Sequence, residues 1–354
     1  MILEILKLVE ELSNANGISG FEDDVLKVIR KHAPQHCEIS EDSMRNLYLT
    51  PNTNTGDKPV VMLDAHSDEV GFMVRAIRPN GLIQFVKVGG WVESNVPAHL
   101  VRIINSDGEV IIGVVASKPP HYVQSNDKLS IETMNIDIGA RSRAEVIEKY
   151  KINLGAPIIP DVSFYFNDKN DAMLGKAFDC RLGCAALVET LKILQNDKLD
   201  VDLVGMISSQ EEVGTRGAIV GTNRVKPDIA IIFEGSPADD TFESEYLIQT
   251  ALHKGPMLRH IDLRMITNPR FQRFALDIAK EYAVPVQQGV RTGGATNGAS
   301  IHISNMGIPS IVIGMPVRYA HTHYGVSSIS DLHNSITLAE KIIKRLNADI
   351  ISGF

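Results

Sequence analysis

The chain has 354 residues, of which 44% are hydrophobic and 22% are charged, proportions typical of a globular protein with a sizeable core. Its net charge of -8 excludes the basic surface of a nucleic-acid-binding protein, and no apolar run approaches the roughly 18 to 20 residues that span a bilayer. Three cysteines, Cys37, Cys180 and Cys184, are too few for a disulfide framework and predict a cytoplasmic protein.

The first 70 residues show a helical pattern followed by a strand pattern. Apolar residues at helical spacing predict amphipathic helices over 2–14 and 21–32. A strand is expected over 47–50. Residues 59–65 form a near-continuous apolar run, which is typical of a strand covered on both faces, and the run ends at His66.

Residues 71–163 have a different texture, with short β-rich runs split by turns. This pattern predicts a small, separate β domain that resembles a barrel. Because the helix–strand alternation stops near Glu69 and resumes near Phe164, the β domain is expected to be inserted into an α/β domain formed by residues 1–70 and 164–354. The expected strands are 72–74, 83–86, 101–104 and 110–115, followed by a helix over 142–150.

After residue 164, helices and strands alternate again. Such an alternation predicts an α/β fold with a mostly parallel sheet and helices on both faces. The expected helices are 181–194, 269–282 and 330–346, and the expected strands are 201–208, 229–233 and 310–314.

Polar side chains gather at the points where the apolar runs end. In an open parallel sheet the carboxyl ends of the strands share one edge, and ligands bind in the crevice there. We therefore expect these residues to converge although they are far apart in the sequence. They are His66, Asp68, Asp179, Glu211, Glu212, Glu234, His321 and His323.

This set of residues favours a metal site. Imidazoles and carboxylates without thiolates suit Zn²⁺, Co²⁺ or Mn²⁺, and the surplus of carboxylates suggests two ions roughly 3.5 to 4 Å apart. Asp179, at a helix entry, is the natural bridge between them, and Asp68 is placed to hold the tautomer of His66. Glu211 and Glu212 point in different directions on an extended segment, so one can bind a metal while the other accepts a proton.

Each of these residues also has a plainer interpretation. His66 with Asp68 could form a surface turn, Asp179 could cap a helix, and the Glu211–Glu212 pair could be a solvated acidic turn. Only their joint occurrence at strand ends favours the metal centre.

Four motifs in chain order resemble those of the metallopeptidase family of glutamyl, deblocking and tetrahedral aminopeptidases, some of which were once labelled cellulase M. The turn over 16–22 resembles the opening motif of the same family, and the similarity covers essentially the whole chain. The four motifs are residues 65–71, 178–184, 210–218 and 316–321.

The resemblance implies a fold and an assembly. It implies a phosphorylase/hydrolase-like catalytic α/β domain over 1–70 and 164–354, with an inserted dimerisation domain over 71–163. It also implies a homo-oligomer, built of dimers and often a hollow dodecamer.

Carried over by position, the resemblance also implies residue roles. His66, Asp179 and Glu234 would bind one ion, while Glu212, His321 and the bridging Asp179 would bind the other. Glu211 would be the general base and Asp68 would orient His66. The expected activity is that of an aminopeptidase with two divalent ions (Zn or Co, or Mn) per subunit, which removes N-terminal residues from short peptides by means of a metal-bridging water.

Two positions depart from the family pattern. Glu234 stands where the family usually has Asp, and in related di-metal exopeptidases a longer carboxylate there often accompanies substrates without a free α-amine. Asn297, in the loop 293–299, removes a negative charge. These departures keep a second hypothesis open, a di-metal amidohydrolase, deacylase or carboxypeptidase-type exopeptidase acting on blocked substrates. A third is a metal-stabilised assembly scaffold with no activity.

The residue that the enzyme would prefer at the peptide N-terminus is not specified by these motifs. His253, Lys254 and Arg259 are candidates to attract an acidic side chain.

Overall fold

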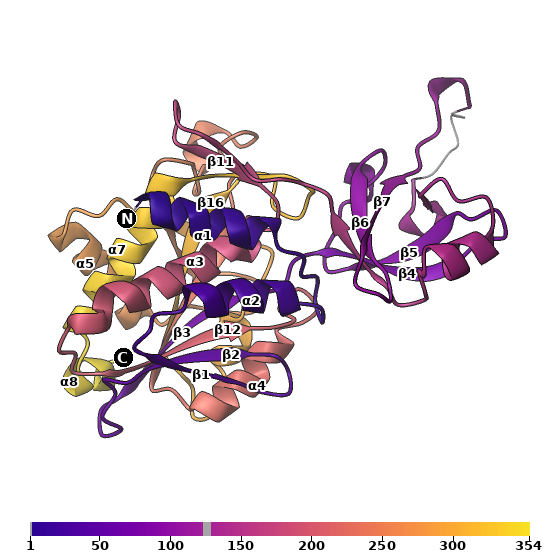
Figure 1. Cartoon of the computed structure of the whole chain (residues 1–354). Coiled ribbons are helices and arrows are strands. Elements are labelled where there is room, and N and C mark those ends of the chain that lie inside the picture. Colours follow the sequence, from indigo (N-terminus) through magenta and orange to yellow (C-terminus); the bar gives the residue numbers. More distant parts are fainter. Residues whose placement is uncertain (1, 123–128) are drawn as a thin grey trace.

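The computed structural model describes residues 2–122 and 129–354, which form two lobes side by side (Figure 1). The main lobe contains an eight-stranded sheet and a three-stranded sheet. The barrel lobe, defined as strands β4 to β9 with the segments that connect them, contains a closed barrel of six strands. In Figure 1 the barrel lobe lies to the right of the main lobe, and both chain termini lie in the main lobe.

The spatial order of the strands differs from their order in the chain. The main sheet runs β1 (Cys37–Glu41), β2 (Leu47–Pro51), β12 (Asp202–Ser208), β3 (Val60–His66), β13 (Ile229–Pro237), β16 (Ser310–Val317), β14 (Met257–Ile261) and β15 (Gln287–Val290). The barrel runs β4 (Gly71–Ile77), β5 (Ile83–Val88), β8 (Ile136–Asp137), β7 (Val110–Val115), β6 (Leu100–Ile104) and β9 (Pro157–Pro160). The small sheet runs β10 (Tyr165–Asn167), β11 (Ala172–Gly175) and β17 (Gly325–Ser328).

Helices cover the main sheet. They are α1 (Ile2–Asn14), α2 (Asp23–His32), α3 (Phe178–Ile193), α4 (Arg216–Val225), α5 (Pro269–Glu281), α6 (Gly298–Ile301), α7 (Ile329–Arg345) and α8 (Ala348–Ser352). Short helical turns lie at Glu93–Asn95, Pro120–Tyr122, Ile131–Thr133, Glu145–Lys149, Leu194–Asn196 and Glu245–Leu247. Among the described residues no helix is long and apolar enough to cross a membrane.

The main sheet is parallel at its centre and mixed at its edges. Strands β12, β3, β13 and β16 are parallel neighbours, while β2 and β14 pair with them in the antiparallel direction. Side chains of β3 alternate between two cores: Val61 and Leu63 pack with α1, α2, α3, α5 and α7, whereas Met62 packs with α4 and α6. The predicted α/β fold with helices on both faces is therefore confirmed.

The predicted barrel-like insertion is also confirmed. It leaves the main lobe after β3 and returns before β10, and its core includes Phe72, Phe85 and Trp91. Leu100 and Ile112 on β6 and β7 are exposed on its outer surface.

The sequence pattern is less accurate for short elements. The helix expected over 142–150 is present over residues 143–149, mostly as the π-helical turn Glu145–Lys149, and Lys151 beyond it has a left-handed backbone (φ 53°). Helix α4 is not among the expected helices, since it is short and contains two glycines, Gly217 and Gly221, which disfavour helices.

Candidate metal centre

The functional residues predicted from strand ends lie together at one edge of the main sheet. His66 ends β3, paired with Ser208 at the end of the parallel strand β12. Glu211 and Glu212 follow β12, and Glu234 lies in β13. His321 belongs to the loop after β16.

Asp179 reaches the same edge from the start of α3. Its backbone and that of Cys180 are non-helical, so regular helix begins only at Arg181. Among the described residues no helix amide donates to the Asp179 carboxylate, which faces His66 and His321 instead.

One group of possible ligands surrounds His66. Its Nε2 lies 3.1 Å from Oδ1 of Asp179 and 3.3 Å from Oε1 of Glu234. With Cys180, these residues offer donor atoms that all lie within 4.8 Å of one another. The Cys180 thiol donates to the carbonyl of Phe233, and burial raises its pKa, so it is a neutral neighbour of the group.

A second group shares Asp179. Nε2 of His321 lies 3.4 Å from Oδ2 of Asp179 and 3.6 Å from Oε2 of Glu212. Each oxygen of Asp179 thus faces a different histidine, as a carboxylate that bridges two ions would.

The spacing of these atoms fits divalent ions. Around a tetrahedral ion with bonds of about 2.0 to 2.2 Å, neighbouring ligand atoms lie roughly 3.3 to 3.6 Å apart. The four separations between ligand atoms in the two groups run from 3.1 to 3.6 Å. The donor set of imidazoles and carboxylates suits zinc, cobalt or manganese.

The buried carboxylates at this edge would also favour bound cations. Burial raises the pKa of Glu212 to about 8 and that of Glu234 to about 7, and repulsion from Asp179 contributes to both shifts. Burying several charged carboxylates without compensating charge is costly, so bound cations would stabilise their charged forms.

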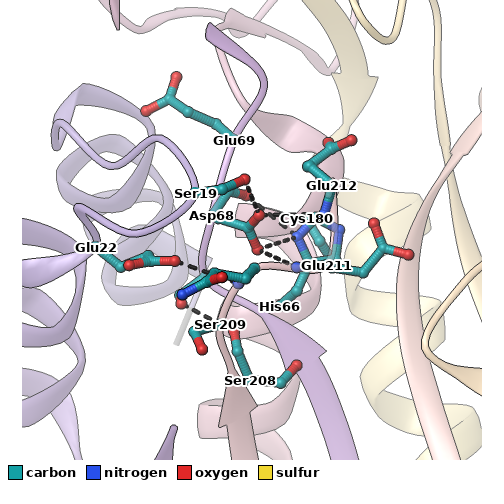
Figure 2. Close-up of polar contacts among 12 residues, drawn as sticks. Ser19, Glu22, His66, Asp68, Glu69, Cys180, Ser208, Ser209, Glu211 and Glu212 are labelled. Carbon is teal, nitrogen blue, oxygen red and sulfur yellow. Dashed lines mark hydrogen bonds and ion pairs between the residues drawn. The ribbon is translucent and has the colours of Figure 1, made fainter. Parts of the chain in front are cut away.

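Asp68 organises the edge through hydrogen bonds (Figure 2). It is fully buried, and its oxygens accept from the Ser19 hydroxyl at 2.6 Å, from the Glu211 amide at 2.9 Å and from the Glu212 amide at 3.1 Å. Nδ1 of His66 lies 3.1 Å from the backbone carbonyl oxygen of Asp68 and 3.3 Å from its Oδ1. These partners lower the pKa of Asp68 although burial alone would raise it. Asp68 thus links the position of His66 to that of both glutamates.

Glu211 lies beside the two groups of possible ligands that share Asp179, but it belongs to neither of them. It shares a third cluster with His66 and Glu212, and its carboxylate lines a cavity next to the metal-ligand groups. Burial raises its pKa well above the usual range, and Glu234 and Glu212 add to the shift.

Two residues of this edge have left-handed backbones. Gln210 has a φ of 52° and His321 a φ of 60°. Residues other than glycine rarely adopt this backbone conformation, so contacts with the surrounding structure must hold Gln210 and His321 in it.

Sequence reasoning misses several supporting contacts. Ser19 stands out in the sequence only as part of a turn motif, yet it bonds Asp68. The backbone carbonyl of Gly90, in the barrel lobe, accepts from Nδ1 of His321 at 2.9 Å. Such a carbonyl carries no signal in the sequence. His323 is one of the predicted strand-end residues, but none of the metal-ligand groups among the described residues contains it.

Asn297, one of the two departures from the family pattern, lies beneath the site. Its amide donates to Oδ2 of Asp64 at 2.8 Å and to the Ser208 hydroxyl at 2.7 Å, and its side chain is buried beneath the ends of β3 and β12. It therefore supports the strands that carry the site and does not line the cavity.

A cavity of about 490 Å³ opens beside the metal-ligand groups. Asp179, Glu211, Glu212, Glu234 and His321 line part of its wall, and Arg259, Arg264 and Arg291 line another part. The sequence-based candidates His253 and Lys254 are exposed and do not line it.

The three arginines differ in how they are held. Arg259 is paired with Asp262 at 3.0 Å and Arg291 with Asp239 at 3.0 Å. In both of these arginines the Nε–H group is buried without a hydrogen-bond partner among the described residues. Arg264 is exposed, and no described residue pairs with its guanidinium. Of the three, Arg264 therefore offers the cavity a positive charge that no described residue neutralises.

A buried ion network supports the loop between β3 and β4. Glu69 accepts from Lys176 at 2.6 Å and from Arg181 at 3.0 Å, and all three side chains are almost completely buried. Arg181 also donates to the carbonyls of Ser67 and Gly17. The network thus joins the start of α3 to the residues that flank His66.

Comparisons with known proteins agree with this geometry. The family described as M42 glutamyl aminopeptidase matches residues 46–338. The glutamyl aminopeptidase of Lactococcus lactis is 31% identical over 99% of each chain. A TET aminopeptidase from a marine sediment thaumarchaeon is 32% identical, with a TM-score of 0.92 over 99% of each chain. The solved dodecamer PhTET1-12s is 25% identical, with a TM-score of 0.86 over 98% of this chain and 99% of that one.

Proposed function

This chain belongs to the M42 glutamyl aminopeptidase family and is a peptide-bond hydrolase, and on that premise we propose that it removes N-terminal residues from short peptides with two divalent ions. The observation that carries the proposal is the convergence of two histidines and four carboxylates beside a cavity that can admit a peptide end. These residues are His66, His321, Asp179, Glu211, Glu212 and Glu234.

We assign the ligands from the two groups. His66, Glu234 and one oxygen of Asp179 would hold the first ion, and Glu212, His321 and the other oxygen of Asp179 would hold the second. When bound, the ions polarise the scissile carbonyl and lower the pKa of water. Zinc, cobalt and manganese all suit these donors.

Glu211 is the proposed general base. It accepts a proton from the attacking water and returns that proton to the leaving amine. Burial raises its pKa, which makes the ionised carboxylate a stronger base toward the attacking water. Asp68 holds His66 and the amide of Glu211 in place, so we propose that it positions the reacting groups without touching the substrate.

Two substitutions separate the roles of the adjacent glutamates. We expect Glu211→Gln to lower kcat by about 10²- to 10⁴-fold while the protein keeps its fold and both ions. Glu212→Gln should instead lower the metal content, which mass spectrometry of the dialysed protein measures. Full turnover in the Glu211→Gln variant would contradict the assignment of the base.

The arginines suggest which N-terminal residue is preferred. We propose an acidic one, because its carboxylate would reach the exposed, unpaired guanidinium of Arg264 in a cavity wall that also contains Arg259 and Arg291. The Lactococcus relative carries the name glutamyl aminopeptidase, in keeping with this preference. Rates on glutamyl and leucyl p-nitroanilides would test it, and equal rates would count against it.

The alternative substrate class rests on Glu234. If this longer carboxylate occupies the space that the α-amine of the peptide would use, the enzyme would cleave blocked substrates. Peptides with a free or an acetylated N-terminus separate the two hypotheses.

We propose that residues 71–163 act as the dimerisation domain and that the protein forms a homo-oligomer in the cytoplasm. Leu100, Ile112 and Val114 expose apolar surface on β6 and β7, and the relative PhTET1-12s is a dodecamer. The cysteines Cys37, Cys180 and Cys184 are unpaired, as expected in a reducing compartment. Light scattering of the purified protein tests the oligomer, and a monomer would contradict it. Fractionation of the host cells tests the cytoplasmic location.

A further inference from the structure

The two groups of ligands are supported by different parts of the molecule. His66 and Glu234 lie on β3 and β13, in the centre of the main sheet. Glu212 and His321 lie in loops that contact the barrel lobe at Gly89 and Gly90.

Gly89 and Gly90 bring the barrel-lobe backbone close to both loop ligands. A Cβ atom at Gly89 would lie 3.3 Å from Cβ of Glu212 and 2.7 Å from Cγ1 of Val70. A Cβ atom at Gly90 would lie 3.1 Å from Nδ1 of His321. The Gly90 carbonyl also accepts from this Nδ1 at 2.9 Å, which leaves Nε2 of His321 free to face Asp179 and Glu212.

His323 fastens the His321 loop to the barrel lobe. Its side chain is only 1% exposed, and its ring stacks on that of His99 with centroids 3.9 Å apart and an interplanar angle of 12°. The ring also meets Trp91 at 5.0 Å, and Trp91 stacks on Phe72 in the barrel core at 4.7 Å. A ligand loop of the main lobe is thus anchored in the barrel lobe two residues beyond His321.

We propose that the barrel lobe positions the second half of the metal centre through this anchor. The contact of His323 with His99 and Trp91, together with the Gly90 carbonyl, sets the affinity for the ion at Asp179, Glu212 and His321. The ion at His66, Asp179 and Glu234 depends on the main lobe alone. This inference rests on the proposed metal-dependent function, and it makes the barrel lobe part of the catalytic unit in addition to its proposed role in assembly.

The test uses His99→Ala in the full chain. His99 is half-buried and holds no metal ligand directly, so its loss removes the stack on His323 without removing a donor atom. His99→Phe is the rescue variant, because it keeps an aromatic ring on His323. Arg102→Ala is the matched control: Arg102 lies on β6 and contacts Asn14 and Asn16 of the main lobe, away from the ligand loops.

Each variant is dialysed against graded concentrations of Zn²⁺, and bound metal per subunit is measured by mass spectrometry. In His99→Ala we expect the ion at His66, Asp179 and Glu234 to bind with wild-type affinity. The affinity for the ion at Asp179, Glu212 and His321 should fall by about 10-fold or more, which is the usual effect of removing a contact that orients a metal ligand. His99→Phe should recover most of this loss, and Arg102→Ala should bind both ions as wild type does. Circular dichroism checks that every variant is folded.

Two results would overturn the inference. In the first, His99→Ala binds both ions with wild-type affinity; in the second, both ions weaken equally in His99→Ala and Arg102→Ala. A wild-type protein that binds fewer than two ions would instead contradict the proposed function itself. If His99→Ala does not fold, Gly90→Ala takes its place, since its methyl group would press on His321 and should weaken the same ion.

Discussion

Replacing Asp68 with Asn tests how the metal centre is supported. The substitution preserves the shape of the side chain and removes its charge. One oxygen of the carboxylate becomes an NH₂ group, which would then face hydrogen-bond donors: the Glu211 amide at the Oδ1 position, or the Ser19 hydroxyl and the Glu212 amide at the Oδ2 position. Nδ1 of His66 would lose its anionic neighbour and keep only the backbone carbonyl of residue 68.

The expected cost follows from these contacts. A hydrogen bond to a charged group contributes about 1.5 to 3 kcal/mol, and the amide can replace no more than one of the two acceptor oxygens. The loss of about two such bonds lowers the free energy of unfolding by about 3 to 6 kcal/mol. Loss of the partner of a ligating imidazole lowers metal affinity by about 10- to 100-fold.

The assay measures urea unfolding, zinc affinity and peptidase activity on the same preparations. Asp331→Asn is the matched control, because Asp331 is also fully buried and accepts from the amides of His253 and Gly255, both at 2.7 Å, away from the metal groups. We expect both variants to lose stability and only Asp68→Asn to lose metal affinity. Wild-type zinc affinity in Asp68→Asn would refute the idea that this carboxylate orients His66.

Two further substitutions probe the cavity and the buried ion network. Arg264→Gln should lower kcat/KM for a glutamyl substrate about 10-fold relative to a leucyl one, because it removes the unpaired positive charge in the cavity; an unchanged ratio of the two rates would exclude Arg264 as a specificity residue. Glu69→Gln should lower the free energy of unfolding by about 3 to 5 kcal/mol, because it leaves Lys176 and Arg181 buried without a counter-charge. Chemical denaturation measures this loss, and a change below about 1 kcal/mol would show that the network is dispensable.

The central strands and their end residues could be predicted because burial on both faces leaves a clear pattern. Apolar runs such as 59–65 and 229–233 have no other place in a soluble chain than the middle of a covered sheet. Once those strands are parallel neighbours, the residues that follow them share an edge. For this reason His66, Glu234 and the Glu211–Glu212 pair lie together as expected.

Short edge elements could not be predicted in the same way. Strands β14 and β15 are only five and four residues long, and polar residues interrupt their apolar pattern. Their pairing depends on neighbours that are distant in the sequence, so local propensity carries little information about them.

The contacts that complete the site were also out of reach. The Gly90 carbonyl, the packing of His323 on His99 and the place of Arg264 in the cavity all depend on how two lobes or several loops meet. From its residue type, Cys180 is expected to be a small packing residue. Its thiol is buried beside His66 and Glu234 and donates to a backbone carbonyl, so it is a neutral neighbour of the ligands.

One experiment tests most directly whether this protein is a metal-dependent aminopeptidase. A short peptide with a free N-terminus and the same peptide with an acetylated N-terminus are incubated with zinc- or cobalt-loaded protein and with a chelated control. Products are followed by mass. Stepwise loss of residues from the free N-terminus, abolished by chelation, is the predicted result. Cleavage of the acetylated peptide alone, or cleavage that chelation does not affect, would contradict the account.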